Sequence, residues 1–164
     1  MEIETKLAAT YNLMFSGDGS YLIANHSDST LRLYDVKQGQ EVRVLVRGEP
    51  YSSTFETSPR GSLLAVPGPD GVISILKLKG GGVASRIDRG SDRSGFVAFH
   101  PSGRWLAASS SQGNLTVWDV RSGKLVKKIS YPQGSRGRIA WTRGGRGIVV
   151  MGGKERVYRF GAEP

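Results

Sequence analysis

Apolar and polar residues alternate in short runs, and these runs lie around regularly spaced glycines. Four glycines lie 42 residues apart, at Gly19, Gly61, Gly103 and Gly145. Apolar residues stand six positions before each glycine, at Leu13, Phe55, Val97 and Ile139. They recur three positions after it, at Leu22, Leu64, Leu106 and Ile148, and five positions after it, at Ala24, Val66, Ala108 and Val150. This alternation on both sides of a glycine turn predicts a β-hairpin.

Two further strands complete each repeat. A polar turn follows the hairpin at Asp28-Ser29, Asp70-Gly71 and Gln112-Gly113, and a third apolar run follows at 31–34, 73–76 and 115–118. Fourth strands are expected at 42–46, 83–87 and 125–129. Four strands fill the 42-residue period and leave no room for a helix. We therefore predict an all-β domain over 1–164, with four-stranded antiparallel blades at 13–46, 55–87, 97–130 and 139–160.

A small sheet that is apolar on both faces is not stable alone. It must stack against copies of itself, and radial stacking of such repeats produces a β-propeller.

Several segments resemble the WD-repeat β-propeller family. Tyr34-Asp35-Val36 and Trp118-Asp119-Val120 are similar to the Trp-Asp dipeptide that closes the third strand of a WD blade. The segments 15–19 and 99–103 are similar to its phenylalanine–turn–glycine segment. The resemblance implies a propeller, with Asp28 and Asp70 as the turn carboxylates of their blades.

The chain departs from the family pattern at defined positions. No histidine stands in the loop before a first strand, and Gln112 replaces the turn carboxylate in the third repeat. Lys77 and Arg159 stand where the family's aspartate is expected, if the fourth repeat has lost about two residues. We therefore expect the blades to depend on packing more than on the family's His–Asp–Trp network.

The two ends of the chain are complementary in this scheme. Residues 2–8 occupy the place of an outer strand, whereas the fourth repeat ends after its third strand. The first segment would then close the last blade and cover an open edge. We expect two copies to form an eight-bladed homodimeric ring in this way, because twofold symmetry closes the ring. A compact four-bladed monomer and a half-propeller completed by another chain remain alternatives.

Composition excludes some classes of protein. The chain has 164 residues, of which 38% are hydrophobic, and no cysteine, so disulfides and thiolate metal sites are excluded. No run approaches the ~18 apolar residues of a membrane span. The first residues lack the pattern of a secretory signal. We expect an intracellular, cytoplasmic protein without a membrane segment.

The net charge of +9 is unevenly distributed. Residues 1–82 carry 8 Lys and Arg against 9 Asp and Glu, whereas residues 83–164 carry 15 against 5. The basic second half favours an anionic partner or attraction between subunits.

Loop residues on one rim are the candidate binding residues. In the family geometry this rim would collect Arg47, Tyr51, Arg89, Arg93, Tyr131, Arg136 and Arg138. Arginine and tyrosine dominate binding hot spots, and arginines can hold carboxylates through two hydrogen bonds. We predict a protein-interaction scaffold that binds an acidic peptide. Solubilising loop charges are the plainer alternative, and a nucleic-acid-binding subunit is the rival function, because Arg136-Gly137-Arg138 and 143–147 resemble Arg-Gly-Gly segments.

Catalysis has little support in the sequence. His26 and His100 have no paired nucleophile, and no His and carboxylate cluster has metal-ligand spacing. We expect a protein that is not an enzyme and that needs no cofactor and no metal.

Overall fold

A computed structural model describes residues 9–48, 54–92, 95–110, 112–131, 137–151 and 157–161. These residues form β-strands and turns without a helix, which confirms the all-β prediction. The predicted closing strand at 2–8 lies outside the described residues.

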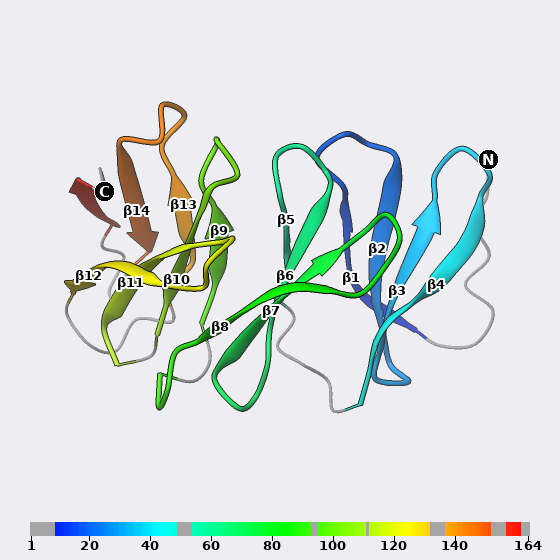
Figure 1. The fold of residues 1–164 in the computed structure, drawn as a ribbon, viewed down its shortest axis with the longest axis horizontal. Helices are drawn as coiled ribbons and strands as arrows, with labels where there is room; N and C mark the ends of the chain where they lie inside the picture. The colour runs from blue at the N-terminus through cyan, green and yellow to red at the C-terminus, as the bar shows by residue number, and fades with distance from the viewer. Residues whose placement is uncertain are drawn as a thin grey trace.

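Fifteen strands form four antiparallel sheets in chain order (Figure 1). The first sheet contains β1 (Thr10–Phe15), β2 (Tyr21–His26), β3 (Thr30–Asp35) and β4 (Gln40–Arg47). The second contains β5 (Glu56–Thr57), β6 (Leu63–Pro67), β7 (Val72–Lys77) and β8 (Val83–Asp88). The third contains β9 (Val97–Phe99), β10 (Trp105–Ser109), β11 (Asn114–Asp119) and β12 (Leu125–Ser130). Among the described residues the fourth has three strands: β13 (Ile139–Trp141), β14 (Gly147–Met151) and β15 (Val157–Gly161).

The 42-residue repeat is also a repeat of strand register. Ile23 pairs with Leu33, Ala65 with Ile75 and Ala107 with Val117, and in the fourth sheet Val149 pairs with Arg159. The expected loss of two residues in the fourth repeat is therefore wrong. Gly161, which pairs with Gly147, takes the place that Asp35 and Asp119 hold, and Arg159 takes a strand position that is apolar in the other sheets.

Each hydrophobic core lies between two consecutive sheets. We call the face of a sheet toward the preceding sheet its leading face, and the opposite face its trailing face. The first core joins the trailing face of the first sheet to the leading face of the second, through Ile23, Leu31, Leu33, Phe55, Leu64 and Val66. Two further cores repeat this arrangement between the second and third sheets and between the third and fourth. Stacking, as expected for sheets that are apolar on both faces, therefore supplies the core.

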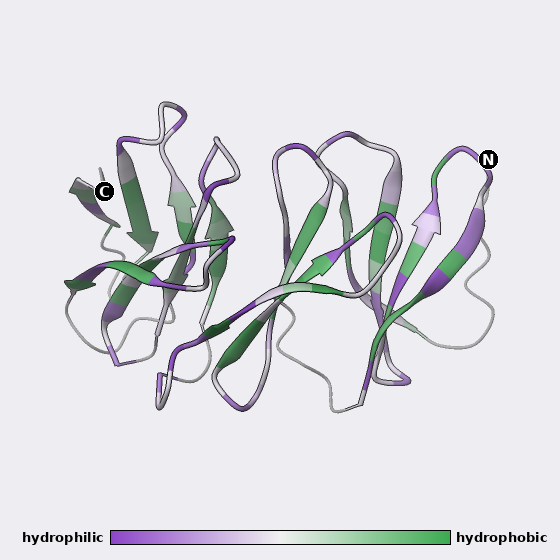
Figure 2. Ribbon diagram, in the orientation of Figure 1, coloured by the Kyte–Doolittle hydropathy of each residue, from purple (hydrophilic) through white to green (hydrophobic). Residues whose placement is uncertain are grey.

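The four sheets lie side by side in a row. The first strands β1, β5, β9 and β13 contact one another in sequence. Figure 1 shows the first and last sheets at opposite ends of the longest axis, so the described sheets do not close a ring within one chain. The alternative of a compact four-bladed monomer is therefore not supported. Figure 2 shows hydrophobic residues in the strands and polar residues at the turns.

Candidate functional site

The repeated glycines close the first turn of each sheet. Gly19, Gly61, Gly103 and Gly145 have φ values of 72°, 68°, 75° and 72°. Each backbone N–H donates to the carbonyl oxygen three residues earlier, over 2.7 to 2.8 Å. A positive φ favours glycine because a Cβ is strained there.

The turn carboxylates hold the next turn. Asp28 accepts hydrogen bonds from the backbone N–H and the hydroxyl of Thr30 and from Arg32. The hydroxyl of Thr30, with help from Arg32, lowers the pKa of Asp28. Asp70 accepts from the N–H of Val72. In the third sheet, where Gln112 replaces the aspartate, Ser110 Oγ accepts from the N–H of Gln112 instead.

The residues of the Trp-Asp-like pairs have separate roles. Asp35 accepts from the N–H of Gln38, and Asp119 accepts from the N–H and the hydroxyl of Ser122. These bonds to Ser122 are the main cause that lowers the pKa of Asp119. Both aspartates therefore stabilise the turn after the third strand. Trp118 is buried, and its Nε1 has no hydrogen-bond partner among the described residues.

Both histidines have structural surroundings. His26 is buried on β2, and its Nε2 lies 2.9 Å from the hydroxyl oxygen of Tyr34 on β3. The ring of His100 packs edge-on against Trp105 and Trp141, with centroids 4.8 and 4.6 Å away. Burial lowers the pKa of His100. His100 thus joins the third sheet to the fourth.

The predicted rim residues separate into exposed and buried side chains. Arg47 is exposed after β4, and Arg138 is exposed with its guanidinium 5.4 Å from the centroid of the Phe96 ring. Arg47 and Arg138 belong to the first and last sheets, at opposite ends of the row, so one chain does not bring them together. Tyr51, Arg93 and Arg136 lie outside the described residues.

Arg89 and Tyr131 stabilise the loops that carry them. Arg89 donates to the carbonyl oxygens of Ser109 and Asp92, and burial lowers the pKa of its guanidinium. Tyr131 is 5% exposed, and its hydroxyl donates to the carbonyl oxygen of Ser110 at 2.8 Å. As partner-binding residues they are therefore poor candidates, because burial and internal hydrogen bonds already use their polar groups.

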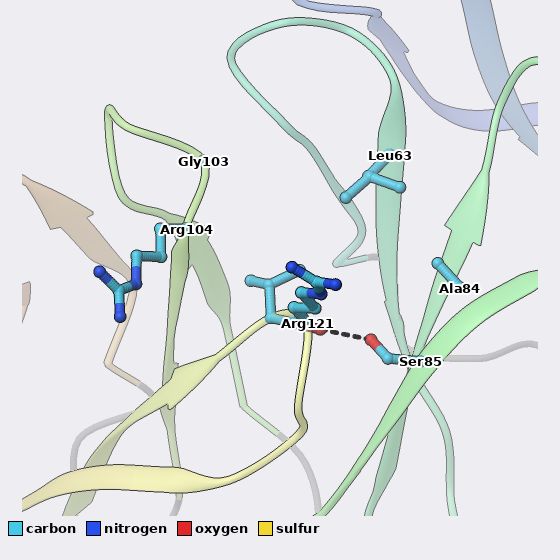
Figure 3. Close-up of a pocket in the computed structure, with 7 residues that line it drawn as sticks. Leu63, Ala84, Ser85, Gly103, Arg104 and Arg121 are labelled. Atoms are coloured by element: carbon cyan, nitrogen blue, oxygen red, sulfur yellow. Dashed lines mark hydrogen bonds between the residues drawn. The ribbon is translucent and has the colours of Figure 1, made fainter.

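A cavity of about 260 Å³ opens between the second and third sheets, on the rim opposite the predicted one. It is lined by Leu63, Ala84, Ser85, Gly103, Arg104, Val120 and Arg121. Figure 3 shows the side chain of Arg121 between Leu63 and Ser85, and the hydroxyl of Ser85 donating to the carbonyl oxygen of Val120. The sequence analysis missed this cavity. A signal was present in positions 43, 85 and 127, which are Arg, Ser and Lys at the repeat spacing.

The two ends of the row carry exposed apolar residues. On the leading face of the first sheet, Tyr11, Leu13 and Phe15 are 67%, 56% and 55% exposed. The repeat equivalents of Leu13 in the second and third sheets, Phe55 and Val97, are 4% and 6% exposed. On the trailing face of the fourth sheet, Met151 and Val157 are 57% and 66% exposed. The equivalents of Val157 are Leu31, Ile73 and Leu115, which are exposed by 6% or less.

Comparison with known proteins agrees with this architecture. Residues 95–119 match the family "WD domain, G-beta repeat". This segment holds the Gly103 turn, β10 and the Trp118-Asp119 pair. Together with the stacked antiparallel sheets, the match identifies a divergent WD-repeat, propeller-like protein. A search of curated proteins found no matching sequence.

Two searches for other kinds of site gave negative results over the described ranges. They contain no cluster of three His, Cys, Asp or Glu side chains that could hold a metal ion. They also contain no helix that is long and apolar enough to cross a membrane.

Proposed function

We propose that this chain is a non-catalytic protein-interaction scaffold that completes its ring by stacking on a second copy of itself. WD repeats suggest the role of an interaction scaffold in general. The eight-bladed homodimer is our proposal for how this chain forms one.

The exposed end faces are the observation that carries the proposal. At every junction within the chain, the trailing face of one sheet covers the leading face of the next. The last sheet leaves a trailing face exposed at Met151 and Val157, and the first leaves a leading face exposed at Leu13 and Phe15. These faces are of the two kinds that pair elsewhere, so a second copy can continue the row. Two such contacts related by a twofold axis close a ring.

The edge of the fourth sheet supports strand exchange. Among the described residues, β15 pairs with β14 and with no other strand. An open edge of this kind is a template for a further strand. Residues 2–8 of the second copy are our candidate for that strand.

Molecular mass tests the assembly. Multi-angle light scattering after gel filtration is expected to give twice 17.7 kDa for the native chain. Leu13→Asp places a charge on the leading face, and we expect it to give the mass of one chain. Leu125→Asp is the matched control, because Leu125 is 49% exposed on the outer strand β12. A native mass of 17.7 kDa, or equal masses for all three proteins, would contradict the homodimer.

A native chain that is monomeric alone, but that gains one mass unit from a different protein, would support the alternative of a half-propeller completed by another chain.

We further propose that the scaffold binds an acidic protein segment. The net charge of +10 over residues 83–164 supports this choice, since charge complementarity steers association. Among the predicted rim residues, Arg47 and Arg138 keep exposed guanidinium groups, whereas Arg89 and Tyr131 do not offer free polar groups.

Nucleic-acid binding is the second candidate function, and the same basic half favours it. Binding through phosphates weakens steeply with salt, because counterions are released. A labelled single-stranded RNA of mixed sequence is therefore the probe. Affinity that falls more than tenfold between 50 and 200 mM salt (an interval typical of such measurements) would favour this function over the acidic protein segment.

A further inference from the structure

One strand position that points from each sheet toward the next has an unusual residue in the second sheet. Arg43, Ser85 and Lys127 lie 42 residues apart. Their registers are equivalent, since Leu33 pairs with Arg43, Ile75 with Ser85 and Val117 with Lys127. The repeat therefore has a long basic side chain at this position in the first and third sheets and a short one in the second.

The long side chain at the first junction reaches the next sheet. A Cβ at Gly81, in the turn between β7 and β8, would collide with Nη1 of Arg43. Nε of Arg43 is buried as well. Arg43 thus occupies the space between its own outer strand and the β7–β8 turn of the following sheet.

The short side chain at the second junction leaves the corresponding space open. Here the following turn, between β11 and β12, lies directly on β8, since a Cβ at Gly123 would collide with the carbonyl oxygen of Arg86. Ser85 reaches only to the carbonyl oxygen of Val120. The cavity of about 260 Å³ begins at this point. It is smaller than the 300–1,000 Å³ of typical small-molecule sites, so it suits one side chain of a partner.

The walls of the cavity combine apolar surface with one available cation. Leu63, Ala84 and Val120 supply the apolar part. Figure 3 shows the guanidinium of Arg121 directed between Leu63 and Ser85, whereas that of Arg104 points away. Arg104 pairs with Asp119 at 3.5 Å and lies 5.2 Å from the centroid of the Trp105 ring. Arg121 makes no ion pair with the described residues, so its charge is available to a carboxylate.

We propose that this cavity is a docking pocket for an acidic protein segment, which inserts one apolar side chain and places a neighbouring carboxylate on Arg121. The proposal deepens the scaffold function and rests on it, and it places acidic-segment recognition on the rim opposite Arg47 and Arg138. Burial of an apolar side chain supplies affinity, and the charge-assisted bond to Arg121 selects acidic neighbours.

The probe is the acetylated pentapeptide Asp-Glu-Leu-Glu-Asp, and its amide analogue Asn-Gln-Leu-Gln-Asn is the control peptide. We expect the acidic peptide to shift the backbone amide signals of Ser85, Gly103 and Arg121 in ¹⁵N–¹H spectra. The amide analogue is expected to bind at least tenfold more weakly, because it lacks the charge that Arg121 attracts.

Two pairs of variants separate the pocket from the rest of the surface. Ser85→Arg restores the long side chain that Arg43 has at the first junction, so the fold tolerates it, and we expect at least tenfold weaker peptide binding. Ser85→Ala leaves the pocket open and is expected to bind within threefold of the native chain. Arg121→Gln should weaken binding tenfold, whereas Arg60→Gln, an equal charge change on an exposed turn, should not.

Unchanged binding by Ser85→Arg, or no binding at millimolar peptide, would overturn the pocket. The mass of each sample is measured in parallel. A failed pocket leaves the homodimer mass in place, whereas a failed homodimer gives the mass of one chain whether or not the peptide binds.

Discussion

Glu56 offers a test of how the second and third sheets pack. This glutamate lies on β5 and pairs with Ala65, a fully buried member of the core between these sheets. Its repeat equivalents, Met14, Ala98 and Ala140, are all apolar. Burial raises the pKa of the Glu56 carboxyl from 4.5 to about 7. The ionised form is therefore penalised in the folded chain.

The size of the penalty follows from the shift in pKa. Each pKa unit corresponds to about 1.4 kcal/mol, so the ionised carboxylate costs about 3 kcal/mol of folding free energy. The folded chain keeps the proton to higher pH than the unfolded chain, where the pKa is 4.5. Stability is therefore lost as the pH rises from about 4.5 to about 7, and the full cost is present above that range.

Glu56→Gln removes the charge and keeps the shape of the side chain. We expect the variant to be about 3 kcal/mol more stable than the native chain at pH 8, and equally stable at pH 4, where both side chains are neutral. Urea unfolding at both pH values, followed by tryptophan fluorescence at one protein concentration, measures the two differences. A stability difference that is the same at pH 4 and pH 8 would refute the assignment of a buried, ionisable Glu56.

Two smaller perturbations test individual contacts. Gly123→Ala places a Cβ at φ 67° and against the carbonyl oxygen of Arg86, so we expect a loss of about 1–3 kcal/mol in urea unfolding. Gly144→Ala is its control, because Gly144 has open space around its Cβ position and is outside the positive-φ region, and a comparable loss there would argue against the close approach of the turn to β8. Tyr34→Phe leaves Nε2 of His26 buried without its 2.9 Å partner, and a lost buried hydrogen bond costs about 1–3 kcal/mol. A melting temperature unchanged by Tyr34→Phe would show that this bond contributes nothing to stability.

The proposed dimer and the proposed pocket use different parts of the repeat. The dimer depends on positions where every sheet is apolar, and the end sheets differ only because no neighbour covers them. The pocket depends on a position where one repeat differs from the other two. A repeat protein can therefore gain a specific site by changing one residue at one junction, while the stacking that holds the sheets together is preserved.

Much of the fold could be predicted from local pattern. The turn glycines, the alternation on the first two strands and the absence of helix all follow from the period of 42 residues, since strand faces and positive φ values are local properties. The match of Phe160 to the tryptophan position was harder to see. Its pairing with Ile148 shows the full repeat spacing, which the missing aspartate at Gly161 had hidden.

Pattern alone did not separate binding residues from structural ones. Arg89 and Tyr131 look like exposed loop residues in the sequence, yet their polar groups are used by carbonyl oxygens of Ser109, Asp92 and Ser110. Those oxygens come from other parts of the chain, and no local signal announces such contacts.

The sequence by itself determined the repeating unit and the faces on which it stacks, because hydrophobic periodicity and glycine turns act over a few residues. Only the tertiary structure decided which faces stay uncovered, at Leu13 and Val157, and where a short side chain at Ser85 leaves a cavity. These features depend on the distance between sheets that are 42 residues apart in the chain, and that distance is set by packing of all the side chains between them.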